Sequence, residues 1–290
     1  MTAQARLTVF SPAKINLHLR IVGRRPDGYH DLETVMLPLE FGDKITLELR
    51  KTGIRLECDN PDLPSDDTNL AVCAAKALDD ERGVKITLKK RIPLAAGLGG
   101  GSSNAAAVLM GLNQLWQAGA SQEKLDKLAA GLGSDINFFL RQGAALCRGR
   151  GEQVEPVPCR LSATILLVNP GFGISTKWAY ESYARSAAGA PAPLGDVTQL
   201  LRALAANDLD GVAKALHNSL EVPSIRKYPV LQLLKDALRA GGAACALMSG
   251  SGATVFGLFA DAKAAERAAG LIRDQFGPST WTQVTRAAGQ

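Results

Sequence analysis

Apolar and polar residues alternate in several short stretches of the first half of the chain. Between Ile15 and Ile21 every second side chain is apolar, which is the period of a strand with one buried face. Because successive side chains of a strand point to opposite sides, Lys14 and Asn16 share its polar face. Similar alternation predicts further strands at residues 45–49, 54–58 and 84–88.

Apolar residues at helical spacing predict helices at residues 69–78 and 105–116, the second with a wide apolar stripe. In the second half, apolar runs predict strands at residues 163–168, 244–248, 254–259 and 280–284. The helices between them are expected at residues 177–186, 197–206, 209–216, 230–240 and 262–275. Asp261 is a candidate cap for the last helix. Strand, helices, strand, strand, helix, strand is the order of a ferredoxin-like α+β layer.

A proline-containing stretch at residues 155–160 predicts a domain boundary. We therefore expect an α+β protein with an N-terminal domain at residues 1–157 and a C-terminal domain at residues 158–290. The first is expected to be an α/β domain with a glycine-rich loop, and the second a ferredoxin-like domain. Residues 187–195, rich in Ala, Gly and Pro, are predicted to form a mobile surface loop.

The composition, 46% hydrophobic and 21% charged, is that of a globular protein with a core. No apolar run reaches the roughly 18–20 residues of a membrane-spanning helix, so no membrane partner is expected. The first residues lack the basic and apolar regions of a signal peptide. Five scattered cysteines without a C-x-x-C pair argue against a disulfide framework or a zinc knuckle and favour the cytoplasm.

The net charge of +5 suits an anionic partner, either nucleic acid or a phosphate-bearing metabolite. Aromatic residues make up only 5% of the chain and do not interleave with the basic clusters, as a nucleic-acid platform requires. The charge pattern therefore favours a metabolite over nucleic acid. A basic RNA-binding α+β protein stays open as an alternative, because the same layer fold hosts such modules.

The strongest chemical signal is the glycine-rich stretch PLAAGLGGGSSN at residues 93–104, directly before the second predicted helix. Its glycines let the backbone approach a ligand closely, and the helix start offers unpaired N–H groups to a phosphate. A flexible loop with a serine cap is the alternative. No Gly-Lys pair of a Walker loop occurs, the Rossmann spacing fails, and no G-x-S-x-G elbow is present. The three histidines lack metal-ligand spacing.

Two further residues could serve phosphoryl transfer, which needs a carboxylate to accept the proton of the attacking hydroxyl. Asp135 could do so, and the Lys14 ammonium could keep it ionised. From the residues alone, Lys14 could equally be a solvated side chain on the polar face of its strand. Asp135 could equally cap a helix that begins at Ile136.

Three blocks of the sequence resemble the signatures of the GHMP kinases, a family that includes galactokinase, homoserine kinase and mevalonate kinase. They are PAKINL at residues 12–17, the glycine-rich block at 93–104, and GSGATVF at 250–256. PDGYH at residues 26–30 and GRGE at 149–152 narrow the resemblance to members that act on a cytidine diphosphate-linked methylerythritol. The resemblance spans nearly the whole chain and is weakest between residues 186 and 226.

The resemblance implies a two-domain GHMP kinase fold and ATP-dependent phosphorylation of the 2-hydroxyl of that polyol. This reaction is a step of isoprenoid precursor synthesis by the non-mevalonate route. Mg²⁺ is expected with ATP, because it bridges the β- and γ-phosphates in phosphoryl transfer. The implied partners are these small molecules alone, with the chain a monomer or a weak homodimer. Another GHMP kinase, or a non-catalytic metabolite-binding regulator on the same scaffold, remains as the alternative.

By resemblance, Lys14 and Asp135 are the catalytic pair. Family members more often have Ala before this Asp and Val-Pro after it, a departure that bears on the local turn rather than on the carboxylate. The residues implied in ATP binding are Asn69, Pro93, Leu94, Ala95, Ala96, Gly97, Leu98, Gly99, Gly100, Gly101, Ser102 and Ser103. Ser103 is also the candidate for a hydroxyl near the metal.

Substrate contacts are implied for Asn16, Tyr29, His30 and Phe172, with Tyr29 stacking on the cytosine and His30 donating or accepting a hydrogen bond. The alternatives are a loop aromatic and a surface histidine at 29 and 30, a core role for Phe172, and a helix cap for Asn69. The turn at residues 250–254 is expected either to shape the site beside the glycine loop or to be an ordinary hairpin turn.

Overall fold

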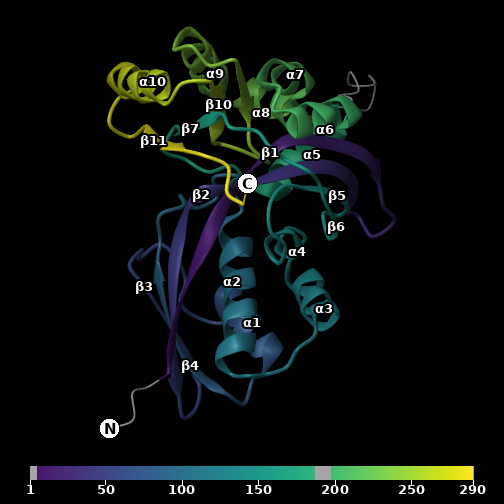
Figure 1. Ribbon diagram of the computed structural model, residues 1–290, viewed down its shortest axis with the longest axis vertical. Helices are drawn as coiled ribbons and strands as arrows, with labels where there is room; N and C mark the ends of the chain where they lie inside the picture. The colour runs from purple at the N-terminus through teal and green to yellow at the C-terminus, as the bar shows by residue number, and fades with distance from the viewer. Residues whose placement is uncertain (1–4, 187–196, 290) are drawn as a thin grey trace.

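The computed structural model describes residues 5–186 and 197–289, arranged as two β-sheets with helices packed against them (Figure 1). The loop predicted at residues 187–195 lies outside the described residues. The strands of the first sheet are β1 (Arg6–Arg24), β2 (His30–Arg50), β3 (Ile54–Cys58), β4 (Gly83–Lys89), β5 (Ala145–Gly149), β6 (Gln153–Pro156) and β8 (His217–Asn218). Those of the second sheet are β7 (Thr164–Asn169), β9 (Cys245–Met248), β10 (Val255–Phe259) and β11 (Trp281–Thr285).

The first sheet is built on a long antiparallel pair of strands, β1 and β2, joined by a turn at residues 25–29. The sheet order is β3-β4-β2-β1-β8, and β5 with β6 continues from the other end of β2. The pairing of β1 with β2 shifts register between Pro12 and Lys14 and again between Asn16 and His18. Such irregularities interrupt regular pairing and re-aim side chains, and Lys14 lies between two of them.

Part of the strand prediction was wrong. The stretch 15–21 belongs to a strand of 19 residues, and its middle is buried on both faces rather than on one. Lys14, Asn16 and His18 are each at most 3% exposed, although they alternate with apolar residues. The period of two correctly predicted the strand, but it could not reveal that other segments of the chain cover the polar face.

Four helices belong to the N-terminal half: α1 (Leu70–Leu78), α2 (Gly100–Leu115), α3 (Gln122–Leu132) and α4 (Ile136–Phe139). The apolar stripe of α2 and the small residues of α1 pack on the inner faces of β2, β3 and β4 and close one hydrophobic core. The lower half of Figure 1 shows α1 and α2 against these strands, with α3 further out. The helix at 122–132 and the strands at 145–149 and 153–156 were not predicted from the sequence.

The second sheet has the strand order β11-β7-β10-β9, and each neighbouring pair is antiparallel. The helices of this half are α5 (Thr176–Ser186), α6 (Val197–Ala206), α7 (Leu209–Ala215), α8 (Glu221–Lys227), α9 (Val230–Ala240) and α10 (Ala262–Phe276). Asp261 caps α10, as predicted, by accepting hydrogen bonds from the backbone N–H groups of Lys263 and Ala264. The ferredoxin-like order predicted for this half is confirmed.

A second hydrophobic core joins the two sheets. It contains apolar residues of β1 and β2 together with residues of β7 and β10, such as Ile15, Leu37, Ile165 and Phe256. Segments far apart in the sequence are therefore packed directly on each other where the sheets meet. The domain boundary at residue 157 stays a prediction. Among the described residues, no helix is both long and apolar enough to cross a bilayer.

Candidate active site

The buried side of β1 places a lysine ammonium where the two sheets meet. The Lys14 Nζ donates hydrogen bonds to Asn16 Oδ1 at 2.7 Å and to the carbonyl oxygen of Gly97 at 3.0 Å. Burial lowers the pKa of Lys14 from its ordinary value, and the nearby Asp135 carboxylate partly opposes this shift. The interpretation of Lys14 as a solvated residue is therefore wrong. Asn16 is fixed in turn by donating to Thr34 Oγ1 at 2.9 Å.

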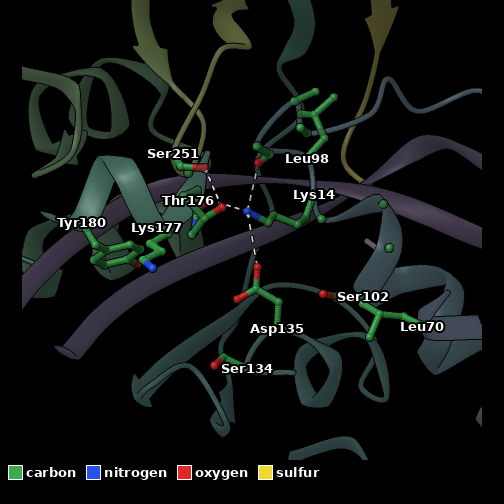
Figure 2. Close-up of a pocket in the computed structure, with 18 of the residues that line it drawn as sticks. Lys14, Leu70, Leu98, Ser102, Ser134, Asp135, Thr176, Lys177, Tyr180 and Ser251 are labelled. Atoms are coloured by element: carbon green, nitrogen blue, oxygen red, sulfur yellow. Dashed lines mark hydrogen bonds and ion pairs between the residues drawn. The ribbon is translucent and has the colours of Figure 1, made fainter. Parts of the chain in front are cut away.

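Asp135 is the charged partner of this lysine. Its Oδ2 lies 3.7 Å from Lys14 Nζ, and its side chain is 37% exposed, so it faces open space on one side and the ammonium on the other. Figure 2 shows the two side chains pointing toward one another from separate elements. Asp135 does precede α4, but its side chain makes no capping hydrogen bond. The capping interpretation is therefore wrong, and the carboxylate is left to interact with Lys14.

Backbone hydrogen bonds to other segments of the chain hold the glycine-rich loop in place. Leu98 accepts a hydrogen bond from the Lys14 backbone N–H at 3.0 Å, and Ala96 accepts one from the Thr254 N–H at 3.2 Å. Gly97 and Gly99 have positive φ angles of 78° and 71°, which most other residues adopt only at a cost. The first turn of α2 has no side-chain cap, so its N–H groups remain available to an anion.

The turn at residues 249–252 packs directly on this loop. Ser249 Oγ donates to the Gly97 carbonyl oxygen at 3.0 Å, and a Cβ added to Gly97 would lie 2.2 Å from the Ser249 carbonyl oxygen. The same turn reaches α5, where Ser251 Oγ lies 3.2 Å from Thr176 Oγ1 (Figure 2). The turn therefore shapes the site, as the first of the two expectations proposed.

A cavity of about 1230 Å³ opens beside these groups. It is bounded by the glycine loop, the β1–β2 turn, α5, and the segments at residues 62–70 and 134–135. Among the residues that the structure describes, six basic and three acidic side chains line it. An excess of positive charge in a concave site concentrates anionic ligands such as polyphosphates. The basic residues are Lys14, Arg24, Lys90, Arg150, Lys177 and Arg185, and the acidic ones are Asp62, Asp135 and Glu181.

One end of the cavity is aromatic. The rings of His30 and Tyr180 stack with centroids 5.4 Å apart, and the Arg150 guanidinium lies over the Tyr29 ring at 5.2 Å. Tyr29 is 55% exposed and lines the cavity, so one ring face is accessible there. Burial, followed by the effect of Arg24, lowers the pKa of His30 from its ordinary value. Burial and then the Asp135 charge raise the pKa of Tyr180.

Asn69 lines the cavity and is also a helix cap, so its helix-cap interpretation is confirmed, and its contact with ATP stays a prediction. Its Oδ1 accepts a hydrogen bond from the Ala71 N–H at 2.9 Å, and its Nδ2 donates to the Pro64 carbonyl oxygen at 2.7 Å. The cap fixes the side chain and thereby the wall of the cavity formed by residues 62–70.

Two of the predicted site residues do not reach the cavity. Ser103 is 1% exposed, and its Oγ accepts a hydrogen bond from Ser11 Oγ at 2.8 Å, beneath the start of α2. Ser102, one residue earlier, lines the cavity instead. Phe172 packs against Tyr228 with ring centroids 5.1 Å apart and joins the third hydrophobic cluster, which favours its core interpretation. The other predicted site residues lie on the cavity wall.

Sequence reasoning missed the contribution of α5. Thr176, Lys177 and Tyr180 all line the cavity, and Lys90 lies beneath the glycine loop with its ammonium paired to Asp43. Thr176 and Tyr180 are four residues apart on α5 and therefore share a helix face, which was a usable signal. Nothing in the sequence indicated which side of α5 turns toward the glycine loop.

Comparisons with known protein families agree with this geometry. Residues 69–143 match the model of the GHMP kinases N terminal domain, and residues 200–276 match that of the GHMP kinases C terminal domain. The first match contains the glycine loop and Asp135, and the second contains the turn at residues 249–252.

Curated relatives match over most of their length. A protein of Synechococcus sp. named 4-diphosphocytidyl-2-C-methyl-D-erythritol kinase is 44% identical over 93% of this chain and 90% of its own. A protein of the same name from Prosthecochloris aestuarii is 42% identical over 96% of this chain and 99% of its own.

Solved structures give the same picture. A crystal structure of 4-(cytidine 5'-diphospho)-2C-methyl-D-erythritol kinase aligns with a TM-score of 0.79 and 35% identity, covering 97% of this chain and all of that one. Homoserine kinase from Cytophaga hutchinsonii aligns with a TM-score of 0.76 at 21% identity, over 100% of this chain and 97% of that one, which shows a shared fold.

Proposed function

The chain belongs to the GHMP kinase family, and we propose that it phosphorylates the 2-hydroxyl of 4-diphosphocytidyl-2-C-methyl-D-erythritol with ATP. The reaction is a step of isoprenoid precursor synthesis by the non-mevalonate route. The observation that carries the proposal is the Lys14–Asp135 pair, 3.7 Å apart on the wall of a cationic cavity. The glycine loop lies on one side of the pair and the aromatic end on the other.

The pair supplies the chemistry of an in-line transfer. The Asp135 carboxylate accepts the proton of the attacking hydroxyl while the new O–P bond forms and the bond between the γ-phosphorus and ADP breaks. The Lys14 ammonium keeps Asp135 ionised and stabilises the negative charge that develops on the transferring group. The carbonyl of Gly97 and the amide of Asn16 hold this ammonium in place.

The two ends of the cavity bind different substrates in this proposal. The N–H groups at the start of α2 and the residues of the glycine loop, 93–102, bind the phosphates of ATP, with Asn69 near its nucleoside. Tyr29 and His30 bind the cytosine, and Tyr180 belongs to the same aromatic group. Lys177 and Arg150 lie on the same wall and neutralise the diphosphate of the polyol.

Mg²⁺ fits the residues present. Among the residues that the structure describes, no three His, Cys, Asp or Glu side chains gather into a metal site. Mg²⁺ that accompanies ATP would need a protein oxygen beside the phosphates, and the Ser102 hydroxyl, which lines the cavity at the start of α2, would supply it. The ion would neutralise charge on the β- and γ-phosphates.

The five cysteines are free thiols, which supports a cytoplasmic location.

The test is a coupled ADP-release assay with three alcohols: the cytidine diphosphate-linked polyol, homoserine and mevalonate. We expect turnover with the first and none above ATP hydrolysis with the other two. Turnover with homoserine or mevalonate instead would make the chain a different GHMP kinase. ATP binding without turnover of any alcohol would favour the metabolite-binding regulator.

A further inference from the structure

A short segment at residues 217–221 contacts both sheets. Its strand β8 pairs in parallel with β1, His217 opposite His18 and Asn218 opposite Leu19. The chain then enters α8 at Glu221. Because Lys14 and Asn16 lie earlier on the same strand β1, this segment is fixed to the strand that carries the catalytic lysine.

Asn218 bonds from this segment to the second sheet. It is 5% exposed, and its Nδ2 donates to the carbonyl oxygens of Met248 at 2.7 Å and of Gly250 at 2.8 Å. Its Oδ1 accepts from the Leu220 N–H at 2.9 Å. Both amide hydrogens and the amide oxygen are therefore used, so the side chain has one defined orientation.

Glu221 completes the contact. Its Oε1 accepts a hydrogen bond from the Met248 N–H at 2.9 Å, and its Oε2 lies 2.6 Å from the Nζ of the buried Lys235. Met248 is the last residue of β9, which is an edge strand of the second sheet. Asn218 and Glu221 thus take the place of a neighbouring strand at the outer N–H and C=O of Met248.

The turn that follows Met248 lies over the Lys14 ammonium. A Cβ built on Gly250 would lie 3.1 Å from the Gly97 carbonyl oxygen, 3.2 Å from Lys14 Nζ and 3.3 Å from Asn16 Oδ1. Ser249 Oγ also donates to the Gly97 carbonyl that accepts from Lys14. If this turn moves away from β1, Lys14 becomes more exposed and the glycine loop loses its hydrogen bond from Ser249.

We infer that Asn218 and Glu221 are positioning residues that clamp the turn at 249–252 against β1 and so hold Lys14 and the glycine loop in their reactive arrangement. Neither side chain lines the cavity, so both act through the turn. The inference rests on the proposed function only where the test measures kcat with the cytidine substrate. The measurement of the Kd for ATP does not depend on that substrate.

The test compares Asn218→Asp with Asn113→Asp. In Asn218→Asp, a carboxylate replaces the donor amide and faces two carbonyl oxygens, which should push the turn away from Lys14. Asn113 has similar bonds at the far end of α2, where its Nδ2 donates to the Ala120 carbonyl and its Oδ1 accepts from the Ala120 N–H. Asn218→Ala, which leaves the carbonyls unpaired without repulsion, serves as the milder variant if Asn218→Asp does not fold.

We expect kcat of Asn218→Asp to fall roughly 10- to 100-fold, the cost of misplacing a catalytic group by about 1 Å. The Kd for ATP should rise more than KM for the cytidine substrate, because the turn bonds directly to the glycine loop through Ser249 and reaches the aromatic end through the start of α5. Asn218→Ala should change the same quantities in the same direction by less. Asn113→Asp should lower the melting temperature and leave all three unchanged.

The pH profile separates positioning from plain stability. Among the described residues, the titratable groups that act on the pKa of Lys14 are Asp135 beside α4 and Cys147 on β5, and Asp135 also raises the pKa of Tyr180 on α5. Wild-type kcat should fall at high pH as Lys14 loses its proton, below the ordinary lysine value because burial lowers its pKa. In Asn218→Asp, water should reach Lys14 and weaken the effect of burial on its pKa. The fall of kcat at high pH, which we call the alkaline limb, should therefore move to higher pH.

A folded Asn218→Asp protein with wild-type ATP affinity and an unshifted alkaline limb would overturn the inference. If the wild type fails to turn over the cytidine substrate, the proposed function fails, and ATP titration of the same variants still decides the clamp. Weaker ATP binding by Asn218→Asp than by Asn113→Asp then supports the positioning role of Asn218. Equal ATP affinity of the two variants contradicts it.

Discussion

The two ends of the cavity are built in different ways. At the glycine loop, the groups that we propose to face the ligand are backbone groups within one run of the chain, residues 93–102. At the aromatic end, they are side chains from the β1–β2 turn, from α5 and from the segment around Arg150. A backbone site is fixed by local conformation, whereas a side-chain site depends on how distant elements pack. The first should therefore be sensitive to backbone substitutions and the second to loss of single side chains.

Asp135 lies between the two ends and should show the largest effect. Asp135→Asn keeps the shape of the side chain but removes the base, so kcat should fall about 10²–10⁴-fold. Binding of both substrates should persist, because neither end loses its own groups. Rapid-quench or coupled assays under saturating substrates, with ATP titration as the control, measure both quantities. A folded Asp135→Asn protein that works at nearly the wild-type rate would contradict the assignment.

Tyr29 tests the side-chain end. Stacking of a base on an aromatic ring contributes about 1–3 kcal/mol in single-strand binders, so Tyr29→Ala should raise KM for the cytidine substrate roughly 5- to 150-fold. KM for ATP should change by less than about 2-fold. Phe10→Ala is the matched control, because Phe10 is a similarly exposed aromatic on β1 and does not line the cavity. A rise in KM for ATP alone would place Tyr29 at the nucleotide end.

Gly97 tests the backbone end. Alanine at this positive φ costs about 1–2 kcal/mol, and its Cβ would also meet the Ser249 carbonyl at 2.2 Å. Gly97→Ala should therefore raise the Kd for ATP roughly 5- to 30-fold. Gly131→Ala on α3 is the control, since a Cβ there meets no atom within 4 Å and Gly131 does not line the cavity. Equal ATP affinity in the two variants would show that the loop conformation does not matter for binding.

The same contrast explains what the sequence could predict. The glycine loop, the turn at 249–252 and the pairing of Lys14 with Asn16 follow from local patterns, and each lies where it was expected. Residues whose role depends on tertiary packing were assigned poorly. Phe172 faces a core rather than the cavity, and Ser103 is turned toward Ser11. Tyr180 was missed because a helical pattern does not say which distant loop its face will meet.

The smallest effect concerns His30 and pH. Burial and Arg24 lower the pKa of His30, so the ring protonates at a lower pH than an ordinary histidine. KM for the cytidine substrate should therefore vary by less than about 2-fold between pH 7 and 8 and rise only on the acid side of the usual value of about 6.5. His30→Asn, which has no proton to gain, should remove the rise. A KM that climbs between pH 8 and 7 would contradict a neutral His30.

The central claim is the transfer itself, and ³¹P NMR of the reaction products tests it most directly. The protein is mixed with ATP, Mg²⁺ and 4-diphosphocytidyl-2-C-methyl-D-erythritol, and the reaction is followed to completion. We predict equal amounts of ADP and of a new phosphomonoester on the 2-hydroxyl, with the cytidine diphosphate linkage intact. Release of inorganic phosphate in place of the monoester, a phosphate on another hydroxyl, or unconsumed ATP would contradict the proposed function.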